Sequence, residues 1–113
     1  MASPHYFVSD VWPRYLDHNS CEQSGCHAAS DGHGYFRLQP GTNLPLFDAP
    51  IDGWPDNWRA NYFASIQLVR CDAPLSSRLF TTPAQLADDH PVGISVDNLA
   101  ESKLLFQTWV DTP

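Results

Sequence analysis

Two cysteines and a histidine lie close together in the segment NSCEQSGCHAA, residues 19–29. Cys21 and Cys26 are five positions apart, and His27 directly follows the second thiol. A disulfide is the simplest chemistry, because it needs only an oxidising compartment and these two cysteines can close a small ring. It gives His27 no role. Since Cys71 is a third cysteine, at least one thiol stays outside any disulfide within the chain.

A zinc site is the second possibility. It would take Cys21, Cys26 and Cys71 together with either His27 or His33 as ligands. The spacing is unfavourable, because adjacent cysteine and histidine ligands strain the backbone around one tetrahedral ion. The sequence also offers no second compact pair of ligands. Zinc is therefore disfavoured.

A covalently attached haem uses all three neighbouring residues. The thiols of Cys21 and Cys26 would add across the vinyl groups of one porphyrin edge, and His27 would be held beneath the iron as an axial ligand. The usual motif has two residues between the cysteines, whereas here there are four, EQSG. The extra residues must bulge outward, which Ser24 and Gly25 make feasible. The motif is therefore compatible with a c-type haem, but by itself it leaves the other two interpretations open.

A helix is predicted directly before the motif, in VSDVWPRYLDHN, residues 8–19. Ser9 can cap it, and Pro13 falls near its first turn, where the missing N–H does least harm. Apolar residues recur at helical spacing, namely Val8, Val11, Trp12, Tyr15 and Leu16. This helix delivers the chain to Cys21.

Two further helices are predicted in the second half of the chain. One covers residues 56–70 with Asp56 as its cap, and its apolar stripe comprises Trp58, Tyr62, Phe63, Ile66 and Val69. The other covers residues 97–111 and presents Leu105, Phe106, Trp109 and Val110 to one side. Before them, residues 28–56 are rich in glycine and proline, which predicts a long loop that covers a ligand.

The order of these features resembles that of class I c-type cytochromes. The resemblance rests on FVSDVWPRYLDHNSCEQSGCH and ESKLLFQTWVD, residues 7–27 and 101–111, and is closest to small single-haem domains of exported bacterial proteins. It implies a mostly α fold in which residues 1–113 form a single cytochrome c-like domain, with long irregular loops wrapped around one covalent haem c. The first and last helices would cross and pack. The haem would fill the interior, so that little core would remain without it.

The same resemblance implies the ligands. Cys21 and Cys26 would form the thioether links, and His27 would be the proximal iron ligand. Family members commonly use a downstream methionine as the second ligand, but the only methionine here is Met1. A ligand other than methionine is therefore expected.

His90 is the predicted sixth ligand. It lies in ADDHPVGI, between the predicted helices and far from His27, where the distal loop of a class I cytochrome would run. Pro91 disfavours a helical conformation for His90 and makes it extended. The other histidines, His5, His18 and His33, have simpler roles at the surface or in turns. Polar groups suited to the haem propionates are Arg37, Arg59, the Trp58 N–H and the Tyr62 O–H.

Composition limits the partners. The chain has 113 residues, enough for one domain, and its 6 basic against 13 acidic residues give a formal charge of −7. Such a charge argues against nucleic acid and anionic membranes as partners. It suits a redox partner protein that carries a basic docking patch. No apolar run approaches the ~20 residues that cross a bilayer. Because haem c is attached outside the bacterial cytoplasm in this family, we expect a periplasmic or extracellular protein whose export signal has been removed.

The expected function is electron transfer by one covalent, bis-histidine haem, so the protein would be a carrier and no enzyme. One alternative is a peroxidase-like or gas-sensing haem domain with an open distal site. Another is a secreted binding module without haem, held by a Cys21–Cys26 disulfide. Haem absorbance and carbon monoxide binding would distinguish the three.

Overall fold

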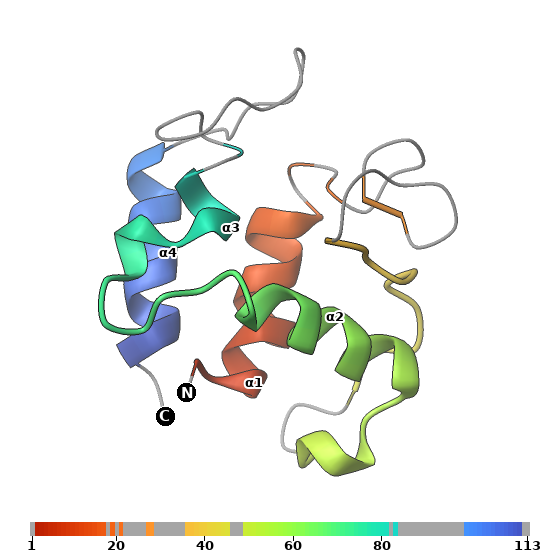
Figure 1. Ribbon diagram of the computed structural model, residues 1–113. Coiled ribbons are helices and arrows are strands. Elements are labelled where there is room, and N and C mark those ends of the chain that lie inside the picture. The colour runs from red at the N-terminus through yellow and green to blue at the C-terminus, as the bar shows by residue number, and fades with distance from the viewer. Residues whose placement is uncertain are drawn as a thin grey trace.

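Helices make up most of the described chain (Figure 1). The computed structural model describes residues 2–17, 19, 21, 27, 28, 36–45, 49–81, 83 and 99–111. The elements are α1 (Pro4–Tyr6), η1 (Phe7–Leu16), η2 (Ile51–Gly53), α2 (Asp56–Ile66), η3 (Pro74–Ser76), α3 (Arg78–Thr81) and α4 (Leu99–Asp111). Within these ranges the β-structure is one isolated parallel bridge, Ala28 with Leu38. The expectation of a small, mostly α domain is confirmed. None of the described helices is long and apolar enough to span a membrane.

The first helix begins earlier than predicted. Its N-cap is Ser3, whose Oγ accepts a hydrogen bond from the Tyr6 N–H at 3.2 Å. The expected cap, Ser9, instead donates its hydroxyl to the Asp10 carboxylate within the helix. The sequence does not distinguish the two starts, because Ser3 and Ser9 both precede a helical pattern. The structure shows the earlier one, in which Phe7 is part of the helix and is buried in the core.

Pro13 lies inside η1 and not near its first turn. The turns of η1 are wider than those of an α-helix: the Asp17 N–H donates to the Trp12 carbonyl, five residues back, at 2.7 Å. In an α-helix, proline lacks the N–H for the ladder and its ring clashes with the carbonyl four residues before it. A π-helical turn relaxes that spacing, so η1 continues past Pro13 to the start of the cysteine motif.

The second predicted helix is confirmed as α2, but its buried face is more polar than the apolar stripe suggested. Trp58 and Tyr62 are fully buried as expected, whereas Phe63 is 45 % exposed. The interior positions between the aromatics are taken by Asn61 and Ser65. The N-cap is Pro55, so Asp56 stands in the first turn instead of capping the helix.

The first and last helices pack against each other, as expected (Figure 1). Tyr15 of η1 meets Phe106 of α4 edge to face, with ring centroids 5.0 Å apart. One turn further along α4, the Trp109 ring centroid lies 5.7 Å from that of Phe7, and the indole N–H donates to the Ser3 carbonyl at 2.9 Å. Aromatic pairs of this kind add ~0.5–1.5 kcal/mol to the free energy gained by burial.

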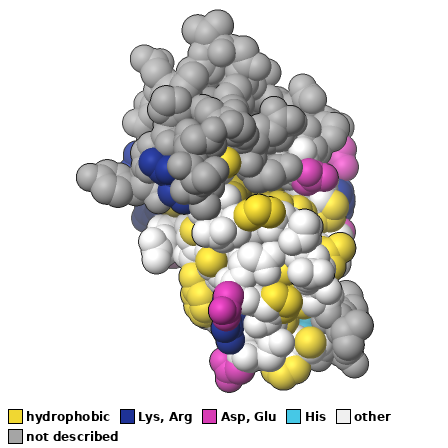
Figure 2. Space-filling model, turned by 90° about the vertical axis from the view of Figure 1, so that its right-hand side faces the viewer, with side chains coloured by type: hydrophobic (Ala, Val, Ile, Leu, Met, Phe, Trp, Pro, Cys, Tyr) yellow, Lys and Arg dark blue, Asp and Glu magenta, His cyan; other side chains and the backbone are white. Residues whose placement is uncertain are grey.

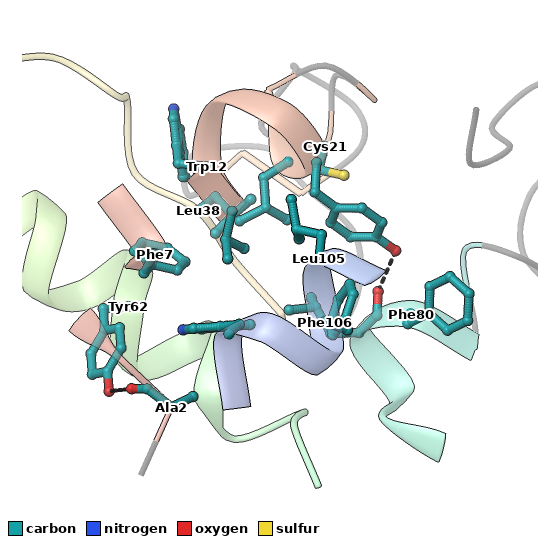
Figure 3. Close-up of a cluster of buried hydrophobic side chains, with 14 of the residues drawn as sticks. Ala2, Phe7, Trp12, Cys21, Leu38, Tyr62, Phe80, Leu105 and Phe106 are labelled. Carbon is teal, nitrogen blue, oxygen red and sulfur yellow. Dashed lines mark hydrogen bonds between the residues drawn. The ribbon is translucent and has the colours of Figure 1, made fainter. Parts of the chain in front are cut away.

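The described residues form an extensive core of their own (Figure 3). Cys21 and Phe80 lie at one end of the buried cluster, and Phe7 and Tyr62 at the other. Its largest fully buried side chains are Trp58, Trp109, Tyr15, Tyr62, Phe7, Phe80 and Phe106. The expectation that little core exists apart from a haem is therefore wrong, because aromatic rings from η1, α2, α3 and α4 pack directly on one another.

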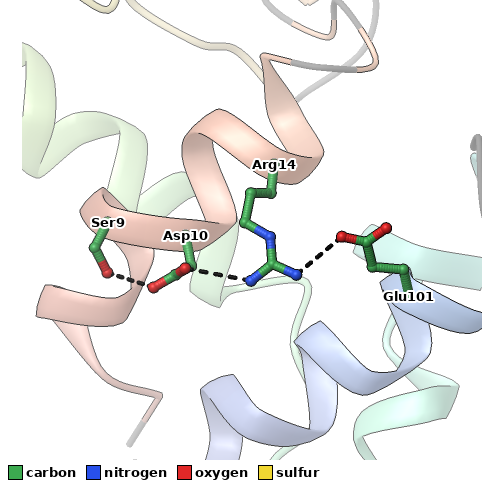
Figure 4. A network of polar contacts seen from close by, with 4 residues as sticks. All are labelled: Ser9, Asp10, Arg14 and Glu101. Atoms are coloured by element: carbon green, nitrogen blue, oxygen red, sulfur yellow. Dashed lines mark hydrogen bonds and ion pairs between the residues drawn. The ribbon is translucent and has the colours of Figure 1, made fainter.

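A polar contact joins η1 to α4 at the surface (Figure 4). Arg14 donates to the Asp10 carboxylate at 3.3 Å and to the Glu101 carboxylate at 3.0 Å. Both acids raise the pKa of Arg14. Since Arg14 and Glu101 are exposed and Asp10 is partly exposed, each ion pair is worth at most ~1 kcal/mol. The interface between the two helices is thus held mainly by its aromatic rings.

Candidate functional site

The structure describes two of the four predicted site residues. Cys21 and His27 belong to the described chain, whereas Cys26 and His90 lie outside the described residues. The histidines His18 and His33, which were weighed against His90, also lie outside them. The geometry of the site can therefore be built from Cys21, His27 and the segment that follows.

Cys21 is positioned by the end of the first helix. Its N–H donates to the Leu16 carbonyl at 2.9 Å, which continues the five-residue spacing of η1 into the motif. The side chain is buried, with 8 % exposed, at one end of the aromatic core (Figure 3). Burial raises the pKa of Tyr15, and the nearby Cys21 thiol raises it further. Cys21 therefore faces the protein interior.

The backbone brings His27 back to Cys21. The His27 N–H donates to the Cys21 carbonyl at 3.1 Å, and the His27 carbonyl accepts the Leu38 N–H at 2.6 Å. Next to this bond lies the bridge between Ala28 and Leu38, whose side chain is buried. Residues 36–38 therefore run beside the end of the motif and hold its backbone.

The imidazole of His27 has a defined orientation. Its Nδ1 lies 2.9 Å from the Phe36 carbonyl oxygen, and the two rings pack with centroids 5.0 Å apart. A carbonyl oxygen can only accept a hydrogen bond, so Nδ1 carries the proton in this contact. In the neutral ring the lone pair is then on Nε2. Histidines that bind metals are commonly oriented by such a bond from the other ring nitrogen.

Residues 39–42 are attached to α2 by side chains that sequence reasoning missed. The Gln39 N–H donates to Asn61 Oδ1 at 2.6 Å, and Asn61 Nδ2 donates to the Gln39 carbonyl at 3.1 Å. Asn57 Nδ2 donates to the Pro40 and Thr42 carbonyls, each at 2.9 Å. The only signal in the sequence was a pair of asparagines in a predicted helix, each directly before an aromatic residue.

Three of the four groups proposed for haem propionates are engaged elsewhere. The Trp58 indole N–H donates to the Thr42 carbonyl at 2.7 Å, and the Tyr62 hydroxyl donates to the Ala2 carbonyl at 2.5 Å. Arg59 bonds the Asp52 carbonyl and the Asp56 carboxylate. These donors stabilise the fold. Arg37 is exposed, and its contact with a haem propionate stays a prediction.

The described residues give no support to the zinc alternative. In the ranges that the structure describes, no three histidine, cysteine or acidic side chains come together in a way that could hold a metal ion. Cys71 is exposed beyond the end of α2, whereas Cys21 is buried at the end of η1. Cys26 and His33, the other proposed ligands, lie outside the described residues.

A cavity of about 360 Å³ lies on another side of η1. Its lining consists of Val8, Trp12, Pro13, Asp17, Gly41, Thr42 and Leu44. The loop approaches η1 closely there, since a Cβ added to Gly41 would lie 2.7 Å from the Trp12 ring. Neither Cys21 nor His27 is among the residues that line this cavity.

No family model, curated protein or solved structure matches this chain. The structure itself defines the chain as a small, mostly helical domain whose first and last helices pack together through aromatic side chains. Its candidate site consists of a buried thiol and an oriented imidazole in a motif held by the end of η1 and by residues 36–38.

Proposed function

We propose that this protein is a single-haem c-type cytochrome that transfers electrons. The observation that carries the proposal is the contact between His27 Nδ1 and the Phe36 carbonyl, 2.9 Å apart. A ligating histidine needs its other nitrogen fixed in this way, and fixing it also raises the basicity of the coordinating nitrogen. A disulfide between Cys21 and Cys26 would not require an oriented imidazole at the next residue.

Cys21 and His27 are donors of the kind that a covalently bound haem uses. Cys21 would supply one thioether sulfur from the end of η1, and His27 Nε2 would supply the axial nitrogen. The haem iron, when present, carries one electron by changing between its ferric and ferrous states. The role of the chain is to hold the imidazole still and to keep water from the thioether, which the burial of Cys21 favours.

His90 is proposed as the sixth ligand. The support comes from the sequence alone: a histidine in a loop, made extended by Pro91, in a chain whose only methionine is Met1. Two imidazole ligands would give a lower reduction potential than a histidine–methionine pair. His90→Ala should then bind carbon monoxide, whereas the unchanged protein should not. If the unchanged protein binds carbon monoxide readily, the sixth coordination position is open, and the peroxidase-like or gas-sensing alternative is favoured.

The proposed setting is an exported electron carrier that meets a redox protein. The formal charge of −7 favours a partner with a basic surface. On the face drawn in Figure 2, acidic and basic side chains of the described residues lie beside one another among apolar ones. Any acidic docking patch would thus involve another face or the residues beyond the described ranges.

The test is covalent attachment in a host that matures c-type haem. The intact mass of the purified chain should exceed the polypeptide mass by one haem, and the haem should resist extraction by acidic acetone. Cys21→Ser should leave at most one thioether and weaken that resistance, while Cys71→Ser serves as the matched control. His27→Ala should abolish the low-spin spectrum, and His5→Ala should leave it intact. An unshifted mass in the unchanged protein would refute the proposal.

A further inference from the structure

We propose that Asn61 is a positioning residue for His27, acting through the backbone of residues 36–39. The inference rests on the proposed function, because it concerns the imidazole that we assign to the iron. Asn61 lies in α2, 34 positions from His27 by their numbers (61 − 27). It touches neither the imidazole nor the cysteine motif by any of the hydrogen bonds described above.

Asn61 pairs with Gln39 as a neighbouring strand would. Both polar groups of its amide bond the backbone of one residue, Oδ1 to the N–H and Nδ2 to the carbonyl. The side chain is fully buried, and burying an amide without partners would cost ~1–3 kcal/mol. These two bonds hold the peptide groups on both sides of Gln39, since neither bond survives a large rotation of the peptide to which it belongs.

Gln39 in turn limits how Phe36 can move. The adjacent Leu38 N–H is bonded to the His27 carbonyl, and the Leu38 side chain is 1 % exposed. The segment is therefore attached to α2 at Gln39 and to the motif at Leu38. Phe36, two residues earlier, presents the carbonyl that accepts from His27 Nδ1. A release of Gln39 would let this carbonyl rotate away from the ring.

The positioning role differs from a purely structural one in what it predicts for His27. If Asn61 only stabilises the fold, its loss lowers the free energy of unfolding and leaves the imidazole unchanged. If it positions Phe36, its loss weakens the bond from Nδ1 and makes the ring a poorer donor to the iron. The ferric state would then be less stabilised, and the reduction potential would rise.

The decisive experiment compares Asn61→Leu with Ser77→Ala. Ser77 is a suitable control because it too is fully buried, and its hydroxyl accepts the Arg70 N–H at 2.9 Å, away from residues 36–39. In the haem-loaded full chain, Asn61→Leu should raise the reduction potential, and Ser77→Ala should leave it at the wild-type value. Equal potentials in all three proteins, or equal rises in the two variants, would overturn the positioning role.

Asn61→Asp provides a second variant in case Asn61→Leu does not fold. A protonated aspartic acid can accept the Gln39 N–H and donate to its carbonyl, whereas the carboxylate would repel that carbonyl. Relative to wild type at the same pH, the potential should match at low pH and rise as the carboxyl ionises. A constant difference across the pH range would contradict the proposal.

A failure of the proposed function gives a distinct result. If the intact mass shows no haem, the same full-length samples can be labelled with ¹⁵N and the His27 imidazole examined by NMR. The wild type and Ser77→Ala should then hold the Nδ1-protonated tautomer, and Asn61→Leu should lose it. A tautomer that is the same in all three would overturn the positioning role, whatever the outcome for haem.

Discussion

The aromatic core and the segment around His27 are held in different ways. Between η1, α2 and α4, large rings are fully buried and contact one another at centroid distances of 4.8–6.3 Å. Around His27, the contacts described include single backbone hydrogen bonds, one bridge, and the hydrogen bond and ring packing with Phe36. The core depends on area removed from water, and the site depends on the placement of a few polar groups. A defect in the core should therefore alter stability, whereas a defect at the site should alter the state of one side chain.

The largest effect is expected from Trp109→Ala in α4. The side chain is fully buried, packs on Phe7 and Phe106, and donates to the Ser3 carbonyl. Its removal should cost about 3–5 kcal/mol of the free energy of unfolding. Leu104→Ala is the control on the same helix, because Leu104 is 62 % exposed, and it should change stability by less than ~0.5 kcal/mol. Denaturant titrations give both free energies of unfolding. Similar losses of stability in Trp109→Ala and Leu104→Ala would contradict the distinction between core and surface.

The second prediction compares the two regions within one molecule. The amides of His27 and Leu38 should exchange with solvent at least tenfold faster than those of Phe106 and Trp109, after correction for intrinsic rates. The reason is that the His27 and Leu38 amides are each held by one backbone hydrogen bond outside a regular helix, so these bonds can open without the core unfolding. Hydrogen exchange followed by NMR gives both sets of rates. Equal protection would mean that the motif and the core open as one unit.

Alkaline pH should affect the core through its buried phenols. Burial raises the pKa of Tyr62 to about 12, and burial also raises that of Tyr15. An unfolded tyrosine loses its proton near pH 10, so the stability that these groups contribute is complete below pH 10. This contribution to the free energy of unfolding should fall as the pH rises from about 10 towards the raised pKa values of the folded state. In Tyr62→Phe the fall should be less steep, which denaturant titrations at several pH values would measure. An unchanged slope would argue against the buried phenol as its cause.

The smallest effect is expected from the surface contact between the first and last helices. Arg14→Gln removes the charge that pairs with Asp10 and Glu101 but leaves the aromatic interface intact. Because the groups are exposed, the loss should be below ~1 kcal/mol and should shrink as salt is added. Thermal melts at low and high ionic strength provide the measurement. A larger loss that is insensitive to salt would show that Arg14 contributes through packing.

Much of the helical framework could be predicted from the sequence. The apolar spacing of Trp58 with Tyr62, and of Phe106 with Trp109, indicated two helices that the structure contains with similar bounds. The predicted start of the first helix was wrong, since Ser3 and Ser9 are both suitable N-cap residues and the sequence does not decide between them. Pro13 was placed in a first turn because a proline in a helix interior is unfavourable in α-geometry, and the π-helical turn of η1 could not be deduced from spacing alone.

For the candidate site, the sequence by itself determined which reactive side chains are available, and the tertiary structure decided the orientation of His27. Covalent order places Cys21 and His27 six positions apart, and the apolar spacing before them predicted a helix there, although not its start. The assignment of Cys26 and His90 stays a prediction from that order. The bond from His27 to Phe36, and the pairing of Asn61 with Gln39, arise only when segments 9 and 22 positions apart are brought together. Periodicity reports which face of a segment is apolar, but a hydrogen bond across the fold also depends on where another segment places its backbone. Only the packed chain supplies that position.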